Sequence, residues 1–158
     1  MIKEKGMEKI ELIKIYSECG FLDLLIYPHQ KVEDVVAPWV DKSIIKTREL
    51  KYTPIPPGMY ANRRLGSDCY PFEIIGRRGK CTYLVRAMNY RLDPTWKPET
   101  VIGGFVGHTT NNYSQEWIIE ADEQGQLIEL RYNQKKRAFC NAQFKLQSHP
   151  IKFYDFNF

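Results

Sequence analysis

Apolar residues along the chain follow two different periods, and the change between them falls near residue 50. From Met7 to Cys19 they recur every three or four residues, the spacing of one face of an α-helix. Gly20 follows at the place where a left-handed residue would end such a helix. The helical spacing returns from Lys31 to Leu50, where Pro38 would start or break a helix. Residues 1–50 are therefore predicted to form a helical appendage.

A proline-rich segment separates this part from the remainder of the chain. Three prolines fall within positions 54–57, and Gly58 follows them. Proline lacks an N–H group and has a fixed φ, so it fits neither a helix interior nor a central strand. Residues 52–58 are thus predicted to be an irregular joint between two domains, residues 1–50 and 51–158.

After the joint, apolar and polar residues alternate, which predicts β-strands joined by short turns. The glycines of residues 76–79 suit a tight hairpin turn, and in the strand after it Leu84 and Val85 belong to opposite faces. The expected strands are residues 70–75, 80–88, 117–121, 126–132, 137–140 and 151–154. Short strands at this spacing predict a small antiparallel β-barrel or rolled sheet, so the fold class is α+β and mainly β.

A polar stretch rich in glycine and aromatic residues, Asp93–Trp117, interrupts the strands and is the best candidate for a binding loop. Glycine lets a ligand approach the backbone, and Thr and Asn supply donors and acceptors. Trp96 is interpreted either as a stacking platform for a base or as packing over one end of the barrel. The candidate ligand contacts in this stretch are Trp96, Gly103, Gly104, His108, Thr109, Asn111 and Asn112.

Three arginines, Arg86, Arg91 and Arg131, fall in or at the ends of predicted strands. Arginine is expected there only if it is paired or faces a ligand, and its guanidinium forms bidentate contacts with carboxylate or phosphate. They are therefore candidate contacts for an anionic ligand. The alternative is a set of salt bridges to acids, namely Glu120, Glu129 and Asp155.

The charge balance also favours an anionic partner. The net charge is +4, but residues 1–50 hold eight Lys and Arg against nine Asp and Glu, so residues 51–158 carry the whole basic excess. Basic clusters mark predicted turns at residues 63–64, 77–80 and 135–137. If these exposed turns lie on the same side of the molecule, their basic residues would form a patch that binds phosphates. The alternative is that these residues only make the protein more soluble.

Composition and residue spacing exclude several other classes. No apolar run approaches the ~20 residues of a membrane span, and the first residues carry acids without an apolar core, so a cytoplasmic protein of the host cell is predicted. The spacing of the four cysteines fits neither a zinc site nor a disulfide framework, so they are interpreted as reduced thiols. No metal site and no cofactor are therefore expected. The cysteines are Cys19, Cys69, Cys81 and Cys140.

His108 is the one residue of the central stretch suited to acid–base catalysis near neutral pH. Catalysis would also need a nucleophile and an orienting acid, for which Asp68 or Glu116 is the candidate. The sequence contains no complete catalytic set. A small hydrolase that acts on a nucleotide or phosphodiester is thus the alternative to a binding protein.

Several motifs after residue 55 form a distinctive set when taken together. They are Ser67-Asp68-x-Tyr70-Pro71, residues 86–91, Asp93-Pro94-x-Trp96-Lys97-Pro98, Gly103-Gly104-Phe105-x-Gly107-His108-x-x-Asn111, Gln115-x-Trp117 and residues 153–158. This set resembles a family of small proteins encoded by tailed phages and prophages, to which no activity is assigned. The resemblance covers about residues 55–158 and implies a phage or prophage origin and a compact, mostly β domain.

These observations predict a non-enzymatic phage or prophage accessory protein. It would bind either an anionic partner, such as a nucleotide or nucleic acid, or a host protein, including a component of host defence. A structural component of the virion is the third alternative. The aromatic segment 153–158 either closes the sheet or docks on a second copy of the chain in a homo-oligomer.

Overall fold

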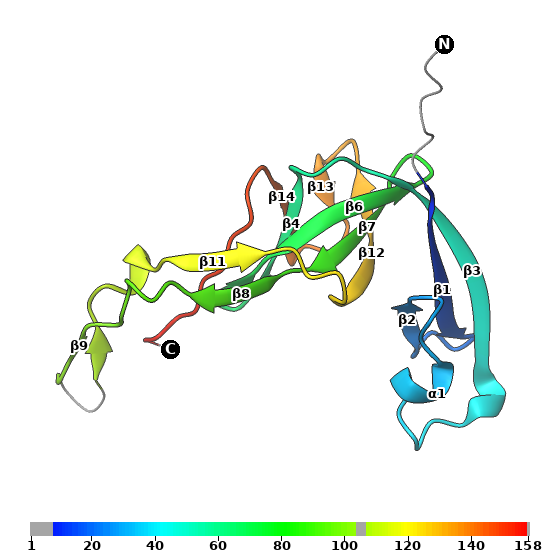
Figure 1. The fold of residues 1–158 in the computed structure, drawn as a ribbon, viewed down its shortest axis with the longest axis horizontal. Coiled ribbons are helices and arrows are strands. Elements are labelled where there is room, and N and C mark those ends of the chain that lie inside the picture. Colours follow the sequence, from blue (N-terminus) through cyan, green and yellow to red (C-terminus); the bar gives the residue numbers. More distant parts are fainter. Residues whose placement is uncertain (1–7, 104–106, 158) are drawn as a thin grey trace, which may run out of the picture.

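The computed structural model describes residues 8–103 and 107–157, which form a mainly β fold. An antiparallel sheet curls into a half-barrel, a pair of strands leaves it as an arm, and the N-terminal strands lie at the opposite end (Figure 1). The prediction of a mainly β fold with a small barrel or rolled sheet is confirmed.

The strands of the described residues are short and joined by turns. They are β1 (Ile10–Ser17), β2 (Asp23–Ile26), β3 (Ile45–Pro54), β4 (Tyr60–Leu65), β5 (Asp68–Tyr70), β6 (Phe72–Arg78), β7 (Thr82–Ala87), β8 (Asn89–Leu92), β9 (Thr100–Val101), β10 (His108–Thr109), β11 (Trp117–Glu120), β12 (Leu127–Asn133), β13 (Ala138–Phe139) and β14 (Phe144–Gln147). The helical elements are one turn each: α1 (Val32–Val35), η1 (Lys42–Ile44) and η2 (Asn112–Ser114).

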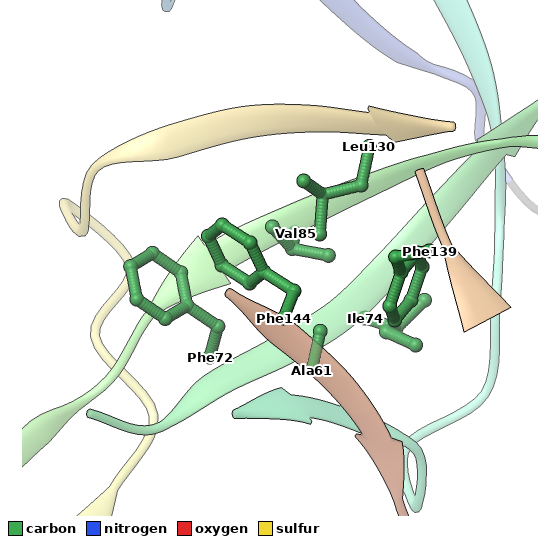
Figure 2. Packing of buried hydrophobic residues seen from close by; sticks show 7 residues of the cluster. All are labelled: Ala61, Phe72, Ile74, Val85, Leu130, Phe139 and Phe144. Atoms are coloured by element: carbon green, nitrogen blue, oxygen red, sulfur yellow. The ribbon is translucent and has the colours of Figure 1, made fainter. Parts of the chain in front are cut away.

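The main sheet has the strand order β13-β12-β7-β6-β3-β1-β2, and β4 joins it through β6 while also pairing with β5 and β14. Strand β13, which pairs with β12, also contacts β14, which pairs with β4. The sheet therefore curls around a first hydrophobic core. Figure 2 shows the packing of this core, in which Phe144 lies edge-on to Phe72 with 5.3 Å between the ring centroids. The first core contains Ala61, Phe72, Ile74, Val85, Leu130, Phe139 and Phe144.

The N-terminal strands cover the other side of β6, β7 and β12. Leu84 of β7 packs there against Leu12 of β1 and Leu50 of β3 in a second core. Neighbours Leu84 and Val85 thus serve different cores, which is the alternation that the sequence predicted for this strand. Strand β2 reaches β12, so the N-terminal strands fold over the sheet.

The predicted helix over Met7–Cys19 is wrong, because Ile10–Ser17 form strand β1; Met7 lies outside the described residues. Leu12 faces the second core, while Ile13 and Ile15 face a third core on the opposite side, with Ile26 and Val36. A strand that is packed on both faces loses its alternation, and its apolar spacing then imitates a helix. The β-branched isoleucines favour the strand.

The predicted helix over Lys31–Leu50 is also wrong. Only one turn, α1, forms before Pro38, and β3 begins at Ile45. The predicted irregular joint begins later than expected, since β3 continues to Pro54, which lies opposite Gly76 of β6. The described residues 8–50 are therefore not a helical appendage, because their strands β1, β2 and the start of β3 belong to the main sheet. Within the described residues, no helix is long and apolar enough to span a membrane.

Most of the strands predicted after residue 60 are confirmed, with shifted ends. The first hairpin turn lies at residues 79–81 rather than 76–79, because β6 continues through Gly76 to Arg78 with an irregularity in its pairing. The predicted strand 151–154 is reduced to an isolated bridge between Phe153 and Cys69. Strand β14 was not predicted from the sequence.

The arm consists of β8 paired with β11, which follow β7 and lead into β12 (Figure 1). At the base of the arm, the backbone of Gly125 lies very close to the backbone of Ala87. A Cβ added at Gly125 would lie 2.1 Å from the carbonyl oxygen of Ala87. The N–H of Ala87 donates to the carbonyl of Gln126 at 2.9 Å, and this hydrogen bond holds the two segments together. Only glycine fits between them at this point.

Gly125→Ala is expected to destabilise the protein by about 1–3 kcal/mol, because the strands must move apart to admit the methyl group. Urea unfolding followed by tryptophan fluorescence measures the change. The matched control is Gly103→Ala, where the added Cβ meets nothing within 4 Å. Equal unfolding midpoints for the two variants would contradict the close approach at Gly125.

Candidate anion-binding surface

The polar residues of the predicted binding loop hold the C-terminal segment 150–157. The buried side chain of Asn112 donates to Asp155 Oδ1 at 3.0 Å and accepts from the N–H of Phe156 at 3.1 Å. The backbone of Thr109 exchanges two hydrogen bonds with the side chain of Asn157, at 2.7 and 3.0 Å. These two candidate ligand contacts are thus engaged within the chain.

Asn111 and Trp96 are engaged in a similar way. The Asn111 side chain donates to the carbonyl of Lys97 and accepts from the N–H of Glu99, both at 2.7 Å. Trp96 is buried, donates to Ser114 Oγ at 3.3 Å and packs 5.5 Å from the ring of Phe156. Trp96 therefore packs against the C-terminal segment, a contact that the sequence did not predict.

The buried side chain of Lys152 holds the C-terminal segment 150–157 against the base of the arm. The ammonium of Lys152 lies 4.1 Å from the ring centroid of Tyr70, 4.7 Å from that of Tyr90 and 5.2 Å from that of Trp117. It also donates to the carbonyl of Phe153 at 3.3 Å. Burial lowers the pKa of Lys152, and the aromatic faces provide the attraction that water no longer supplies.

His108 lies exposed on β10, opposite Val101 of β9 near the tip of the arm. Among the described residues, no hydrogen bond or ion pair joins it to Asp68 or Glu116, and Asp68 Oδ1 accepts the N–H of Asp155 at 2.8 Å. Gly103 is exposed near the same tip, and Gly104 lies outside the described residues. The structure does not assemble these groups into one site.

The three candidate arginines lie in three separate environments. Arg86 is paired with Glu73, directly opposite on β6, at 2.6 Å, and both side chains are largely buried. Arg91 lies on the exposed arm, 3.9 Å from Glu120, one of its predicted salt-bridge partners. Arg131 is exposed on β12, and no ion pair of the described residues includes it. Arg131 is thus the one of the three that is available to a ligand.

Arg131 belongs to a row of side chains on the side of the sheet that faces β1–β3. Thr82 of β7 lies directly opposite Arg78 of β6 and Arg131 of β12, and directly opposite residues share a face. Lys80, in the turn between β6 and β7, completes the group. Together they line a cavity of about 650 Å³.

Glu129 is the carboxylate of this cavity, and both of its oxygens are engaged. Arg78 donates to Oε1 at 2.8 Å, and the hydroxyl of Tyr52 donates to Oε2 at 2.5 Å. Burial alone would raise the pKa of Glu129, but these hydrogen bonds outweigh it and hold the pKa below its usual value. Burial, together with the bond to Glu129, raises the pKa of Tyr52.

A second group of cations lies on the N-terminal strands. Lys14 of β1 and Arg48 of β3 are directly opposite, on the side that Leu12 and Leu50 turn toward the sheet. With Asp23, which pairs with Lys14 at 3.2 Å, they line a cavity of about 340 Å³. The charge of Lys14 also contributes to the lowered pKa of Glu129.

We call these two groups together the basic surface. It holds more positive than negative charge, since five cations face two carboxylates, Asp23 and Glu129. Its cations are Lys14, Arg48, Arg78, Lys80 and Arg131. Such a surface attracts anions and fixes phosphate or carboxylate groups through charged donors.

Sequence reasoning found only one residue of the basic surface, Arg131, as a candidate contact. Arg78 and Lys80 were recognised as basic, but Arg78 was assigned to the turn because the end of β6 was placed too early. Lys14 and Arg48 fell in regions predicted to be helical. Their strand pairing, which puts both on one face, follows only from the correct secondary structure.

Comparison of the chain with protein-family models, with curated proteins and with solved structures finds no match. The resemblance to phage and prophage proteins therefore stays a prediction. The described residues bring together no group of three or more His, Cys, Asp or Glu side chains that could hold a metal ion.

Glu129→Gln is expected to lower stability at neutral pH by about 1–3 kcal/mol, because it removes the charged partner of Arg78. Since folding lowers the pKa of Glu129, its contribution is present above the unfolded pKa and is lost as the pH falls through the folded pKa. The deficit of the variant should therefore shrink from about pH 7 to about pH 3 in urea unfolding experiments.

The control for this pH series is Glu123→Gln, at an exposed position between β11 and β12. We expect it to follow the wild-type protein at both pH values. A constant deficit of Glu129→Gln across the range would show that the ionised carboxylate does not stabilise the fold.

Proposed function

We propose that this protein acts by binding an anionic partner on the basic surface, and that the partner is single-stranded nucleic acid. One observation carries the proposal. Arg48, Lys80 and Arg131 line the two cavities, and within the described residues none of them takes part in an ion pair. Cations that no carboxylate neutralises are available to phosphates, which dominate the affinity for nucleic acids.

The distribution of the cations favours a polymer over a single nucleotide. They belong to two cavities, one at the β6–β7 turn and one on β1 and β3, instead of converging on one point. A strand with a charge at every phosphate satisfies such an extended set. Tyr16 in the second cavity adds an aromatic side chain on which a base can stack.

Binding is favoured over catalysis by the state of the acidic group in the larger cavity. Glu129 already accepts hydrogen bonds on both oxygens, from Arg78 and Tyr52, so it is held as a structural partner of a cation. The neighbouring cations position phosphates without supplying a base. The alternative of a hydrolase that uses His108 lacks a supporting contact among the described residues.

The resemblance of residues 55–158 to phage and prophage proteins supports an accessory role in an infected cell. A protein of this kind would occupy a nucleic acid of the host or of the phage, and interference with host defence falls within this role. A host protein with an acidic surface is the alternative partner, and a place in the virion is the third prediction.

Fluorescence anisotropy with labelled single-stranded DNA and RNA of roughly 16 nucleotides tests the proposal. We expect binding that weakens as salt is raised, and we expect the double variant Lys80→Glu/Arg131→Glu to raise the Kd about tenfold or more. The slope of log K against log salt should become shallower by about 0.7 for each phosphate that the variant no longer neutralises.

The matched control is a charge reversal, Lys97→Glu, in the segment between β8 and β9. Strand β9 lies at the end of the molecule opposite to β1–β3 (Figure 1). We expect Lys97→Glu to change the affinity little. Equal reductions of affinity in the control and in the double variant would show that the basic surface is not the binding site, and no binding at low salt would refute nucleic acid as the partner.

A further inference from the structure

A third cavity lies on a different part of the molecule, between β4, β5, η2, β14 and the C-terminal segment. Its volume is about 420 Å³, and we call it the tail pocket. Small-molecule sites have volumes of about 300–1,000 Å³, so the tail pocket is large enough for a ligand of modest size. The residues that decide its chemistry are Arg64, Cys69, Tyr113, Lys145, Gln147 and Phe153.

Two cations reach the tail pocket from neighbouring strands. Lys145 of β14 lies directly opposite Asn62 of β4, and Arg64 is two residues along the same strand, so the three side chains share one face. Neither Lys145 nor Arg64 takes part in an ion pair of the described residues. The two cations are therefore free to hold one anionic group between them.

The carboxylate of Asp155 borders the tail pocket but is already engaged. Its Oδ1 accepts from the backbone N–H of Asn157 at 2.9 Å and from the side chain of Asn112 at 3.0 Å. These hydrogen bonds, that of Asn157 first, lower the pKa of Asp155. It stays ionised and bound to the arm, which leaves Lys145 and Arg64 to an external anion.

The opposite wall of the tail pocket is aromatic. The rings of Tyr113 and Phe153 stack with centroids 5.9 Å apart and planes 18° apart. Tyr113 is 91% exposed, so a flat ring meets an open aromatic surface there. Stacking on aromatic side chains is the common way in which proteins hold a nucleobase.

The Asn62 side chain, which also lines the tail pocket, is held in place by hydrogen bonds within the chain. The buried amide of Asn62 donates to Gln147 Oε1 at 2.8 Å and to the carbonyl of His149 at 3.0 Å, and it accepts from the N–H of Ile151 at 2.9 Å. Burial raises the pKa of the Cys69 thiol, so the sulfur stays protonated and lines the pocket as an apolar group.

We infer that the tail pocket binds a small molecule that joins a planar aromatic ring to a single phosphate, as a nucleoside monophosphate does. Lys145 and Arg64 hold the phosphate, and Tyr113 stacks on the ring. This site is separate from the basic surface: it is built by β4, β5, η2, β14 and the C-terminal segment, whereas the basic surface is built by β1, β3, β6, β7 and β12. The tail pocket thus binds one nucleotide, in addition to the single-stranded nucleic acid on the basic surface.

Isothermal titration calorimetry of the full chain with AMP, GMP, CMP and UMP tests the inference. We expect one nucleotide per chain with a Kd below about 1 mM, and about tenfold weaker binding of adenosine alone and of inorganic phosphate alone. Lys145→Gln and Tyr113→Ala should each weaken nucleotide binding about tenfold, since one removes a charge and the other a stacking surface.

The control variants separate the two sites. Lys97→Gln and Arg131→Glu should leave nucleotide binding unchanged, because neither residue lines the tail pocket. Tyr113 is exposed, and Tyr113→Ala is therefore expected to fold, as circular dichroism can verify. If no nucleotide binds at about 1 mM, the inference is wrong. It is equally wrong if Arg131→Glu abolishes binding while Lys145→Gln and Tyr113→Ala retain it, an outcome that would place the nucleotide on the basic surface.

Discussion

The strands at the centre of the sheet are packed on both faces, and the rest of the structure depends on this constraint. Leu84 and Val85 are adjacent on β7 and both are fully buried, one in each core. The sheet must therefore curl around the first core and must also be covered by other strands on its outer side. Strands β1–β3 provide that cover, which explains why residues far from β7 in sequence share its second core.

The cover leaves polar groups at the edges of the second core. Along β12, Leu127 belongs to that core, whereas Glu129 and Arg131 lie beyond it on the same face. Glu129 can lie there because Arg78 and Tyr52 donate hydrogen bonds to its two carboxylate oxygens. A partly buried charge with its hydrogen bonds formed costs little folding free energy. The edge of the core thus determines where the cations gather.

The parts of the fold that the sequence predicted well have a residue pattern that alternates along the strand, or a clear turn. Strands β6, β7, β11 and β12 were recognised by this alternation and the glycines near residue 79 by their place between two strands, so these elements were predicted with errors at their ends only. Strand β1 was missed because the apolar residues of its two faces together fall at three- and four-residue intervals, and periodicity cannot then separate a strand from a helix.

The candidate site was predicted less well for a related reason. Which cations share a surface depends on strand register, and register cannot be derived from composition. Asn112 and Thr109 were predicted to contact a ligand, and the sequence alone could not show that their hydrogen-bond partners within the chain lie more than forty residues away. Long-range hydrogen bonds of this kind leave no local pattern.

The attachment of residues 150–157 also sets an order of events during synthesis. Asn112 and Thr109 form their hydrogen bonds to Asp155 and Asn157 only after these residues have left the ribosome. The aromatic side chains that surround the Lys152 ammonium likewise contact it only after Lys152 has emerged. The half-barrel strands up to β12 are translated earlier, and domains begin to fold from the N-terminal side. The hydrogen bonds between the arm and residues 155–157 consequently form after the strands up to β12 have been made, and a nascent chain that stalls before residue 150 carries an arm whose Asn112 side chain lacks these partners.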